Sequence, residues 1–151
     1  MSTDTTDDPI RIAFVCVQNA GRSQMATAFA ERERDRRGLA DRVEILTGGT
    51  RPADGVHEEV IAVMDDIGID LADRTPREIT PDELRSCDTV ATMGCSTLEL
   101  GGVDAAVDVR DWALADPNGR DLEGVREIRD GIEDRVAALF DEFSDASGRS
   151  H

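Results

Sequence analysis

Residues 10–36 constrain the fold more than any other part of this chain of 151 residues. They open with a short apolar run over residues 10–15, which is typical of a strand buried on both faces of a parallel sheet. Apolar residues then recur at helical spacing over residues 23–36, with Ser23 as the expected N-cap. A strand followed directly by a helix predicts an α/β fold.

The rest of the chain repeats this alternation. Further strands are expected at residues 43–47, 88–93 and 105–109, and further helices over residues 56–67, from Thr80 and over residues 122–143. The sequence therefore predicts a four-stranded parallel sheet flanked by helices, in a Rossmann-like arrangement of three layers. We expect one domain over residues 10–144, between an acidic, disordered N-terminal segment at residues 1–9 and a disordered tail at residues 145–151.

The turn between the first strand and the first helix begins with the thiol of Cys16, continues through five residues and ends with the guanidinium of Arg22. Its backbone N–H groups are expected to converge at the helix N-terminus, and Arg22 adds a planar fork suited to a tetrahedral oxyanion. These positive groups favour the thiolate form of Cys16. We expect Asn19 to brace the loop and the Ser23 hydroxyl to donate to the Cys16 sulfur. A structural reading, a buried cysteine beside an arginine, accounts for the same residues less completely. The candidate substrate-binding residues are Val17, Gln18, Asn19, Ala20, Gly21, Arg22 and Ser23.

The other candidate residues follow from their place relative to the strands. In a parallel sheet, ligands bind at the carboxyl ends of the strands. Cys95 follows the third predicted strand and Asp116 follows the fourth, so both can share an edge with Cys16. Cys87 precedes its strand, roughly 20 Å from that edge, and we interpret it as structural. The alternative readings are a small buried residue for Cys95 and a turn residue before Pro117 for Asp116.

Two segments carry a resemblance to a known family: residues 16–23, Cys-Val-Gln-Asn-Ala-Gly-Arg-Ser, and residues 116–117, Asp-Pro. With them, residues 10–143 resemble the low-molecular-weight protein tyrosine phosphatase superfamily. Residues 24–26, Gln-Met-Ala, and residues 92–95, Thr-Met-Gly-Cys, are most similar to its arsenate reductase branch. The chain also has no tyrosine, whereas phosphatases of this family tend to carry aromatic residues in the late loop.

The resemblance implies roles for the candidate residues. Cys16 would be the nucleophile, the loop amides and Arg22 would hold the oxyanion, and Asp116 would be a proton donor. Cys95 would be the thiol that attacks the adduct on Cys16. The implied function is reduction of arsenate to arsenite through a cysteine–arsenic adduct. The alternatives are hydrolysis of phosphomonoesters through a phosphocysteine, and a non-catalytic oxyanion-binding module.

No bound cofactor or metal is implied, but a reductase needs an external thiol reductant, which is thioredoxin, glutaredoxin or a small thiol. Two departures from the family bear on this requirement. Gly21 stands where many relatives have a second cysteine, and no thiol follows Cys95 at the short distance found in many thioredoxin-linked reductases. Either Cys16 and Cys95 form a pair of two thiols, or an external thiol resolves the adduct.

The charge of the chain restricts its partners and surroundings. There are 33 acidic and 17 basic residues, the formal net charge is −16, and every basic residue is arginine. Such a surface repels nucleic acid and anionic membranes, so the expected partners are an arsenate or phosphate oxyanion and a thioredoxin-like reductant. The acidic N-terminal segment and the lack of long apolar runs predict a cytoplasmic protein. Four arginines, Arg32, Arg34, Arg36 and Arg37, are expected to form a solvated helix face with local ion pairs.

Because salt screens self-repulsion, the net charge predicts a protein adapted to a high-salt cytoplasm. The thermal unfolding midpoint is expected to rise by several degrees between low salt and molar salt. Circular dichroism during heating at a series of salt concentrations measures this change. A midpoint that stays constant across the series would contradict the adaptation.

Overall fold

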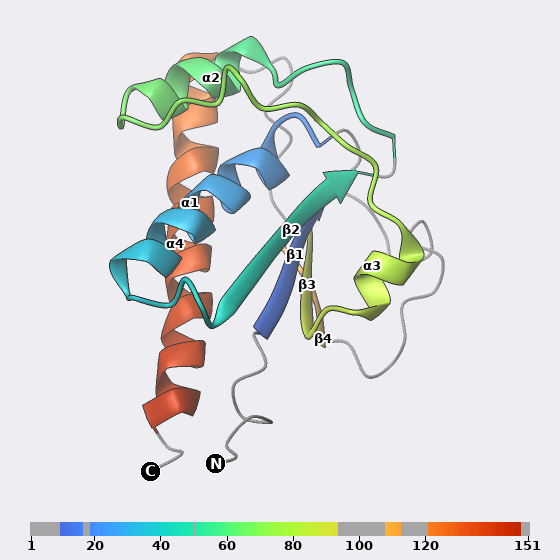
Figure 1. The fold of residues 1–151 in the computed structure, drawn as a ribbon. Coiled ribbons are helices and arrows are strands. Elements are labelled where there is room, and N and C mark those ends of the chain that lie inside the picture. Colours follow the sequence, from blue (N-terminus) through green and yellow to red (C-terminus); the bar gives the residue numbers. More distant parts are fainter. Residues whose placement is uncertain (1–9, 17–18, 50, 94–107, 113–120, 149–151) are drawn as a thin grey trace.

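The computed structural model describes residues 10–16, 19–49, 51–93, 108–112 and 121–148 (Figure 1). Four strands form one parallel sheet in the order β2-β1-β3-β4. The strands are β1 (Ile10–Cys16), β2 (Val43–Gly49), β3 (Thr89–Met93) and β4 (Asp108–Asp111). This arrangement confirms the predicted parallel α/β fold.

Helices cover both faces of the sheet (Figure 1). Helices α1 (Arg22–Arg36), α2 (Glu58–Asp65) and α4 (Leu122–Gly148) share one core with Ile12 and Phe14 of β1. The short helix α3 (Pro81–Arg85) packs over the other face, where Ala13 and Val15 are buried. Alternate residues of a strand point to opposite faces, so β1 contributes to both cores. Cys16 lies on the face of α1.

The fourth strand ends two residues later than predicted. The expectation was residues 105–109, whereas β4 runs from Asp108 to Asp111 and pairs with β3 over that length. Residues 105–107 lie outside the described part of the chain. Local composition does not fix where this strand ends, because the end is set by the pairing with β3, in which Asp111 lies opposite Thr92.

Helix ends also differ in part from the predictions. Thr80 caps α3 in a capping box with Glu83, where a helix start was predicted. Helix α2 begins at Glu58 with His57 as its N-cap, two residues after the predicted start at residue 56. Helix α4 continues to Gly148, past the residue 144 at which the domain was expected to end. No glycine or proline interrupts residues 132–147, so nothing in that sequence stops the helix earlier.

The arginine-rich end of α1 is not only a solvated face. Arg34 and Arg36 pair locally with Asp35 and Glu33, as predicted. However, Arg32 pairs with Glu133 and Arg37 with Asp141, both on α4. The guanidinium of Arg32 lies 4.9 Å from the ring centroid of Phe29, and that of Arg37 lies 5.9 Å from the ring centroid of Phe140. Long arginine stems cover apolar surface while their charged ends reach across the helix interface, which the spacing along one helix cannot reveal.

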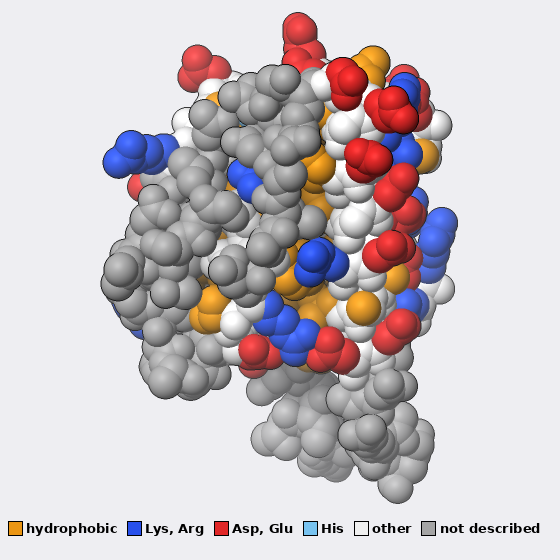
Figure 2. All heavy atoms as spheres, turned by 180° about the vertical axis from the view of Figure 1, so that it is seen from behind, with side chains coloured by type: hydrophobic (Ala, Val, Ile, Leu, Met, Phe, Trp, Pro, Cys, Tyr) orange, Lys and Arg blue, Asp and Glu red, His pale blue; other side chains and the backbone are white. Residues whose placement is uncertain are grey.

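Helix α4 carries much of the visible negative charge of the fold. Its exposed acidic side chains follow the outward face of the helix (Figure 2): Glu123, Glu127, Asp130, Asp134, Asp141 and Glu142. Among the described residues, no helix is long and apolar enough to cross a membrane.

Gly48, near the end of β2, allows the chain at Ile79 to approach the strand closely. A Cβ atom at Gly48 would lie 2.5 Å from the Ile79 Cβ and 2.9 Å from its backbone nitrogen. The bonded neighbour Gly49 donates to the Arg77 carbonyl at 2.9 Å and accepts from the Ile79 N–H at 3.3 Å. The absence of a side chain at Gly48 therefore permits these hydrogen bonds.

Gly48→Ala is expected to lower the free energy of unfolding by about 1–3 kcal/mol, because the backbone at Ile79 has to move away from the strand. Denaturant unfolding measures the change. Gly55→Ala is the matched control, since a Cβ at Gly55 would meet no atom within 4 Å. Equal unfolding midpoints for the two variants would show that the close approach at Gly48 is not required.

Candidate active site

Cys16 is the last residue of β1 and lies at the carboxyl edge of the sheet. It is paired with Gly49 of β2 and Met93 of β3, so three strands end at the same level. Its side chain is buried, and the half-buried Arg22 opens α1 six residues later. This is the edge where ligands bind in parallel α/β sheets.

Part of the predicted site lies in the described residues and part does not. Asn19, Ala20 and Gly21 are buried beside Cys16, in the turn that leads into α1. Val17 and Gln18, the candidate acid Asp116 and the candidate second thiol Cys95 lie outside the described residues. The roles of those residues therefore stay predictions.

The Cys16 sulfur lies within hydrogen-bond distance of two donors. The Asn19 backbone N–H donates to it at 3.2 Å, and the Ser23 Oγ lies 2.9 Å away. The Asn19 Nδ2 donates to this same Oγ at 2.7 Å. Either the Ser23 hydroxyl or the Cys16 thiol can donate in this contact, and the Ser23 hydroxyl is the donor when the sulfur carries no proton. Hydrogen bonds donated to a sulfur stabilise the anion through which a cysteine acts as a nucleophile.

Ser23 does not cap the helix, which corrects the sequence prediction. Helix α1 starts at Arg22 with Gly21 in the N-cap position, and no side chain caps it. Ser23 is the second helical residue, and its hydroxyl is turned toward Cys16 and Asn19 instead of the first turn of the helix. The sequence predicted two roles for this hydroxyl, capping the helix and contacting the Cys16 sulfur, and the structure shows the second.

Asn19 braces the loop through every polar atom of its side chain. Its Nδ2 donates to the hydroxyl oxygens of Ser23 and Thr47, the second at 2.9 Å. Its Oδ1 accepts from the backbone N–H of Arg77 at 3.0 Å and from the Gln24 Nε2 at 3.2 Å. The backbone of Asn19 has a φ of +52°, a left-handed conformation that asparagine tolerates better than most residues. Four hydrogen bonds therefore fix a backbone turn that aims an N–H at the sulfur.

Sequence reasoning missed several neighbours of this turn. Thr47 lies near the carboxyl end of β2 and bonds both Asn19 and the Phe14 carbonyl, so the edge rule applied to every strand would have found it. The Ala20 carbonyl accepts from the His57 N–H at 2.9 Å, which joins the loop to the start of α2. Gln24 is buried on the same turn, and its Oε1 has no hydrogen-bond partner among the described residues. Neither the His57 contact nor the Gln24 contact has a local sequence signal.

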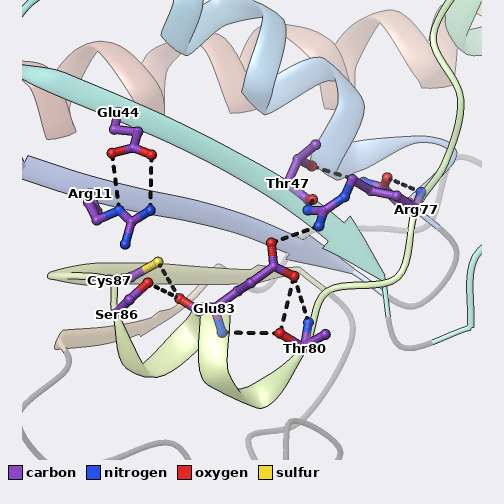
Figure 3. Close-up of polar contacts among 9 residues, drawn as sticks. Arg11, Glu44, Thr47, Arg77, Thr80, Glu83, Ser86 and Cys87 are labelled. Atoms are coloured by element: carbon purple, nitrogen blue, oxygen red, sulfur yellow. Dashed lines mark hydrogen bonds and ion pairs between the residues drawn. The ribbon is translucent and has the colours of Figure 1, made fainter.

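Cys87 lies far from Cys16, as predicted. It precedes β3, whose first residue pairs with Ile12, and it belongs to the core on the α3 face. Its sulfur donates to the Glu83 carbonyl at 3.3 Å (Figure 3). Burial raises the pKa of the Cys87 thiol above its ordinary value, and the nearby Arg11 only partly opposes this effect. A protonated, buried thiol at the opposite edge fits a structural residue.

The described part of the chain contains no group of three or more side chains suited to hold a metal ion. The described geometry places the Cys16 sulfur beside the N-terminus of α1. A tetrahedral oxyanion at that helix end would meet backbone N–H groups and the positive end of the helix dipole.

Ser23→Ala removes one of the two donors to the Cys16 sulfur. The pH profile of Cys16 alkylation by iodoacetamide is expected to move up by about one pH unit, because a hydrogen bond to a charged group is worth roughly 1.5–3 kcal/mol. Mass spectrometry of the Cys16 peptide isolates this thiol from the others. Thr27→Val is the control, since the Thr27 hydroxyl donates to the Ser23 carbonyl at 2.7 Å and not to the sulfur. Superimposable profiles for Ser23→Ala and the wild-type protein would rule out the donor role.

The comparisons with known proteins agree on the family. The family profile described as low molecular weight phosphotyrosine protein phosphatase matches residues 11–147. A putative arsenate reductase of Halobacterium salinarum is 68% identical over 95% of this chain and 98% of its own length. A glutaredoxin arsenate reductase of Synechocystis is 32% identical, over 89% of this chain and 98% of its own.

A solved structure has the same fold. The thioredoxin-dependent arsenate reductase of Corynebacterium glutamicum superposes with a TM-score of 0.74 at 27% identity, over 97% of this chain and 65% of that chain. The family match and this superposition cover nearly all the elements described above. The chain belongs to the low molecular weight phosphotyrosine protein phosphatase family.

Proposed function

We propose that the protein is an arsenate reductase in which Cys16 is the nucleophile. The observation that carries the proposal is the pair of donors on a buried sulfur at the start of α1, 3.2 Å and 2.9 Å away. The similar proteins described above as arsenate reductases support the choice of substrate. Arg22 and the loop amides are the proposed oxyanion-binding groups.

The first step forms a bond between sulfur and arsenic. The Cys16 thiolate attacks the arsenic of arsenate, and one arsenic–oxygen bond breaks as that oxygen leaves, protonated, as water. We propose Asp116 as a donor of that proton. The loop donors that hold the remaining oxygens also stabilise the charge that develops on them in the transition state.

The second step reduces the arsenic. A second thiolate attacks the Cys16 sulfur, a disulfide forms, and the electron pair of the sulfur–arsenic bond stays on arsenic, which leaves as arsenite. Two thiols are thereby oxidised while arsenic(V) becomes arsenic(III). Cys95 is the proposed second thiol, and a small external thiol is the alternative. A dithiol reductant of the thioredoxin or glutaredoxin kind then restores the cysteines by thiol–disulfide exchange.

Phosphomonoester hydrolysis is the second candidate function, because the family profile that matches the chain is that of a phosphatase. It uses the same attack by Cys16 and the same proton donor, but water resolves the phosphocysteine and no second thiol is needed. We place either activity in one domain from residue 10 to the end of α4 at Gly148. We also propose that this domain works in a cytoplasm of high salt, which the net charge of −16 supports.

A paired assay at high salt separates the two functions. Arsenite production with a thiol reductant is expected to exceed release of phenol from an aryl phosphate, and Cys16→Ser is expected to abolish both. Cys95→Ser is expected to stop multiple turnover with thioredoxin while sparing formation of the first adduct. Cys87→Ser is the matched control and should keep arsenate turnover, since Cys87 lies at the opposite edge of the sheet. Aryl phosphate turnover far above arsenate turnover would reverse the order of the two candidates.

A further inference from the structure

We propose that Arg77 is a positioning residue for the Cys16 nucleophile, because its side chain fixes the Asn19 turn that aims two donors at the sulfur. The inference rests on the proposed nucleophilic role of Cys16 and applies to arsenate and phosphate chemistry alike. Arg77 belongs to no helix or strand, and within the described residues its N–H groups donate to Asn19, Thr47 and Glu83 and not to the Cys16 sulfur. Its effect is transmitted through Thr47 and Asn19.

The segment that contains Arg77 lies along the outer edge of β2. Since β2 is the first strand in the sheet order, one of its edges has no neighbouring strand within the described part of the chain. At the carboxyl end of this edge, Gly49 forms an isolated parallel bridge with Glu78 and hydrogen bonds with Arg77 and Ile79 on either side of it. The lack of a side chain at Gly48 permits this approach. The backbone of Arg77 is thereby held next to the end of the strand.

Arg77 closes a ring of hydrogen bonds with Asn19 and Thr47. The Arg77 backbone N–H donates to the Asn19 Oδ1 at 3.0 Å. The Asn19 Nδ2 donates to the Thr47 Oγ1 at 2.9 Å. The guanidinium Nη1 of Arg77 donates to the Thr47 carbonyl at 2.8 Å. Two of the four hydrogen bonds of the Asn19 side chain therefore involve Arg77 and Thr47, and the Arg77 guanidinium links these two residues to each other.

Glu83 orients the guanidinium from its other side (Figure 3). The Arg77 Nη2 donates to the Glu83 Oε2 at 2.7 Å. The other oxygen of this carboxylate accepts from the Thr80 backbone N–H at 3.0 Å, within the capping box of α3. The Glu83 carboxylate, which caps α3, thus anchors Arg77 to that helix. The Arg77 guanidinium in turn reaches β2, next to the strand that ends at Cys16.

The exposure of this ion pair indicates a role in positioning. The Arg77 side chain is 46% exposed and that of Glu83 28%, and ion pairs this open to solvent add little to global stability. The Asn19 turn is sensitive to small shifts, since its φ of +52° persists only while its hydrogen bonds hold it. A slight rotation of Asn19 lengthens the hydrogen bond from its backbone N–H to the Cys16 sulfur and also displaces the Ser23 hydroxyl.

Arg77→Met tests the proposal by removing the guanidinium while keeping the backbone N–H. The pH profile of Cys16 alkylation by iodoacetamide is expected to move up by about half a unit, part of the roughly one unit expected for full loss of a hydrogen bond to a charged group. Arg77→Lys, which keeps one cationic donor, should fall between Arg77→Met and the wild-type protein. The thermal unfolding midpoint should stay near that of the wild-type protein.

Two further variants distinguish positioning from a general effect of charge. Arg85→Met removes an arginine of α3 whose ion pair within the described residues is with Asp82 of the same helix, and it should leave the alkylation profile unchanged. In an Asn19→Ala background, Arg77→Met should add no further shift, because the path through Asn19 is already broken. A wild-type alkylation profile for folded Arg77→Met would overturn the proposal. So would the same shift in the Asn19→Ala background.

Iodoacetamide alkylation also keeps this inference apart from the proposed function. It measures the Cys16 sulfur directly and needs neither arsenate nor a reductant. A protein that reduces no arsenate but shows the Arg77-dependent shift would refute the proposed activity and support the positioning role. A protein that reduces arsenate but shows no Arg77-dependent shift would support the proposed activity and refute the positioning role.

Discussion

Parallel pairing of β1 with both of its neighbours is the interaction on which the rest of the structure depends. Because Cys16 stands level with Gly49 and Met93, three strands deliver their carboxyl ends to one edge. The chain must then turn sharply from β1 into α1, and that turn holds the candidate nucleophile. The same alternation of side chains that buries Phe14 against the helices places Cys16 on the face where α1 begins.

The candidate site combines a strained turn at Asn19 with a side-chain amide whose polar atoms all form hydrogen bonds. The Asn19 side chain has two donors and an acceptor oxygen with two lone pairs, and the structure gives a partner to each. Buried polar groups without partners are costly, so this satisfaction helps to offset the left-handed backbone at Asn19. Its partners come from β2, from α1 and from the segment before α3. The site therefore depends on three separate parts of the chain being in place.

The sequence predicted what depends on local pattern. The strand before Cys16, the helix after it and the capping box at Thr80 each have a short-range signal, and the structure confirms them. The position of β4 and the start of α1 at Arg22 depend on pairing and on competing hydrogen bonds, which local pattern does not contain. The role of Arg77 depends on the docking of its segment onto β2, and no spacing of residues along the chain reveals it. Asp116 and Cys95 were predicted from their place after strands, and they lie outside the described residues.

The arginine pairs also explain how so acidic a chain joins its parts. Arg110 of β4 donates to both carboxylate oxygens of Glu142 on α4, at 2.6 Å and 2.8 Å, and thereby ties an edge strand to the terminal helix. These hydrogen bonds hold the pKa of Glu142 below its ordinary value. Burial opposes ionisation of Glu83, but hydrogen bonds from Arg77 and Thr80 outweigh it and lower the pKa of that carboxyl as well.

The sign of the resulting pH dependence follows from these directions. A carboxylate whose pKa is lowered by folding stabilises the native state above its unfolded pKa, and this contribution is lost as the pH falls through the folded value. Near neutral pH the pairs of Glu83 with Arg77 and of Glu142 with Arg110 are therefore fully formed. Their contribution to stability is lost as the pH falls through the lowered pKa values of these two carboxyl groups. The strand-to-helix contact at Arg110 and the contact at Arg77 are consequently weakened by acid and not by a rise in pH through neutrality.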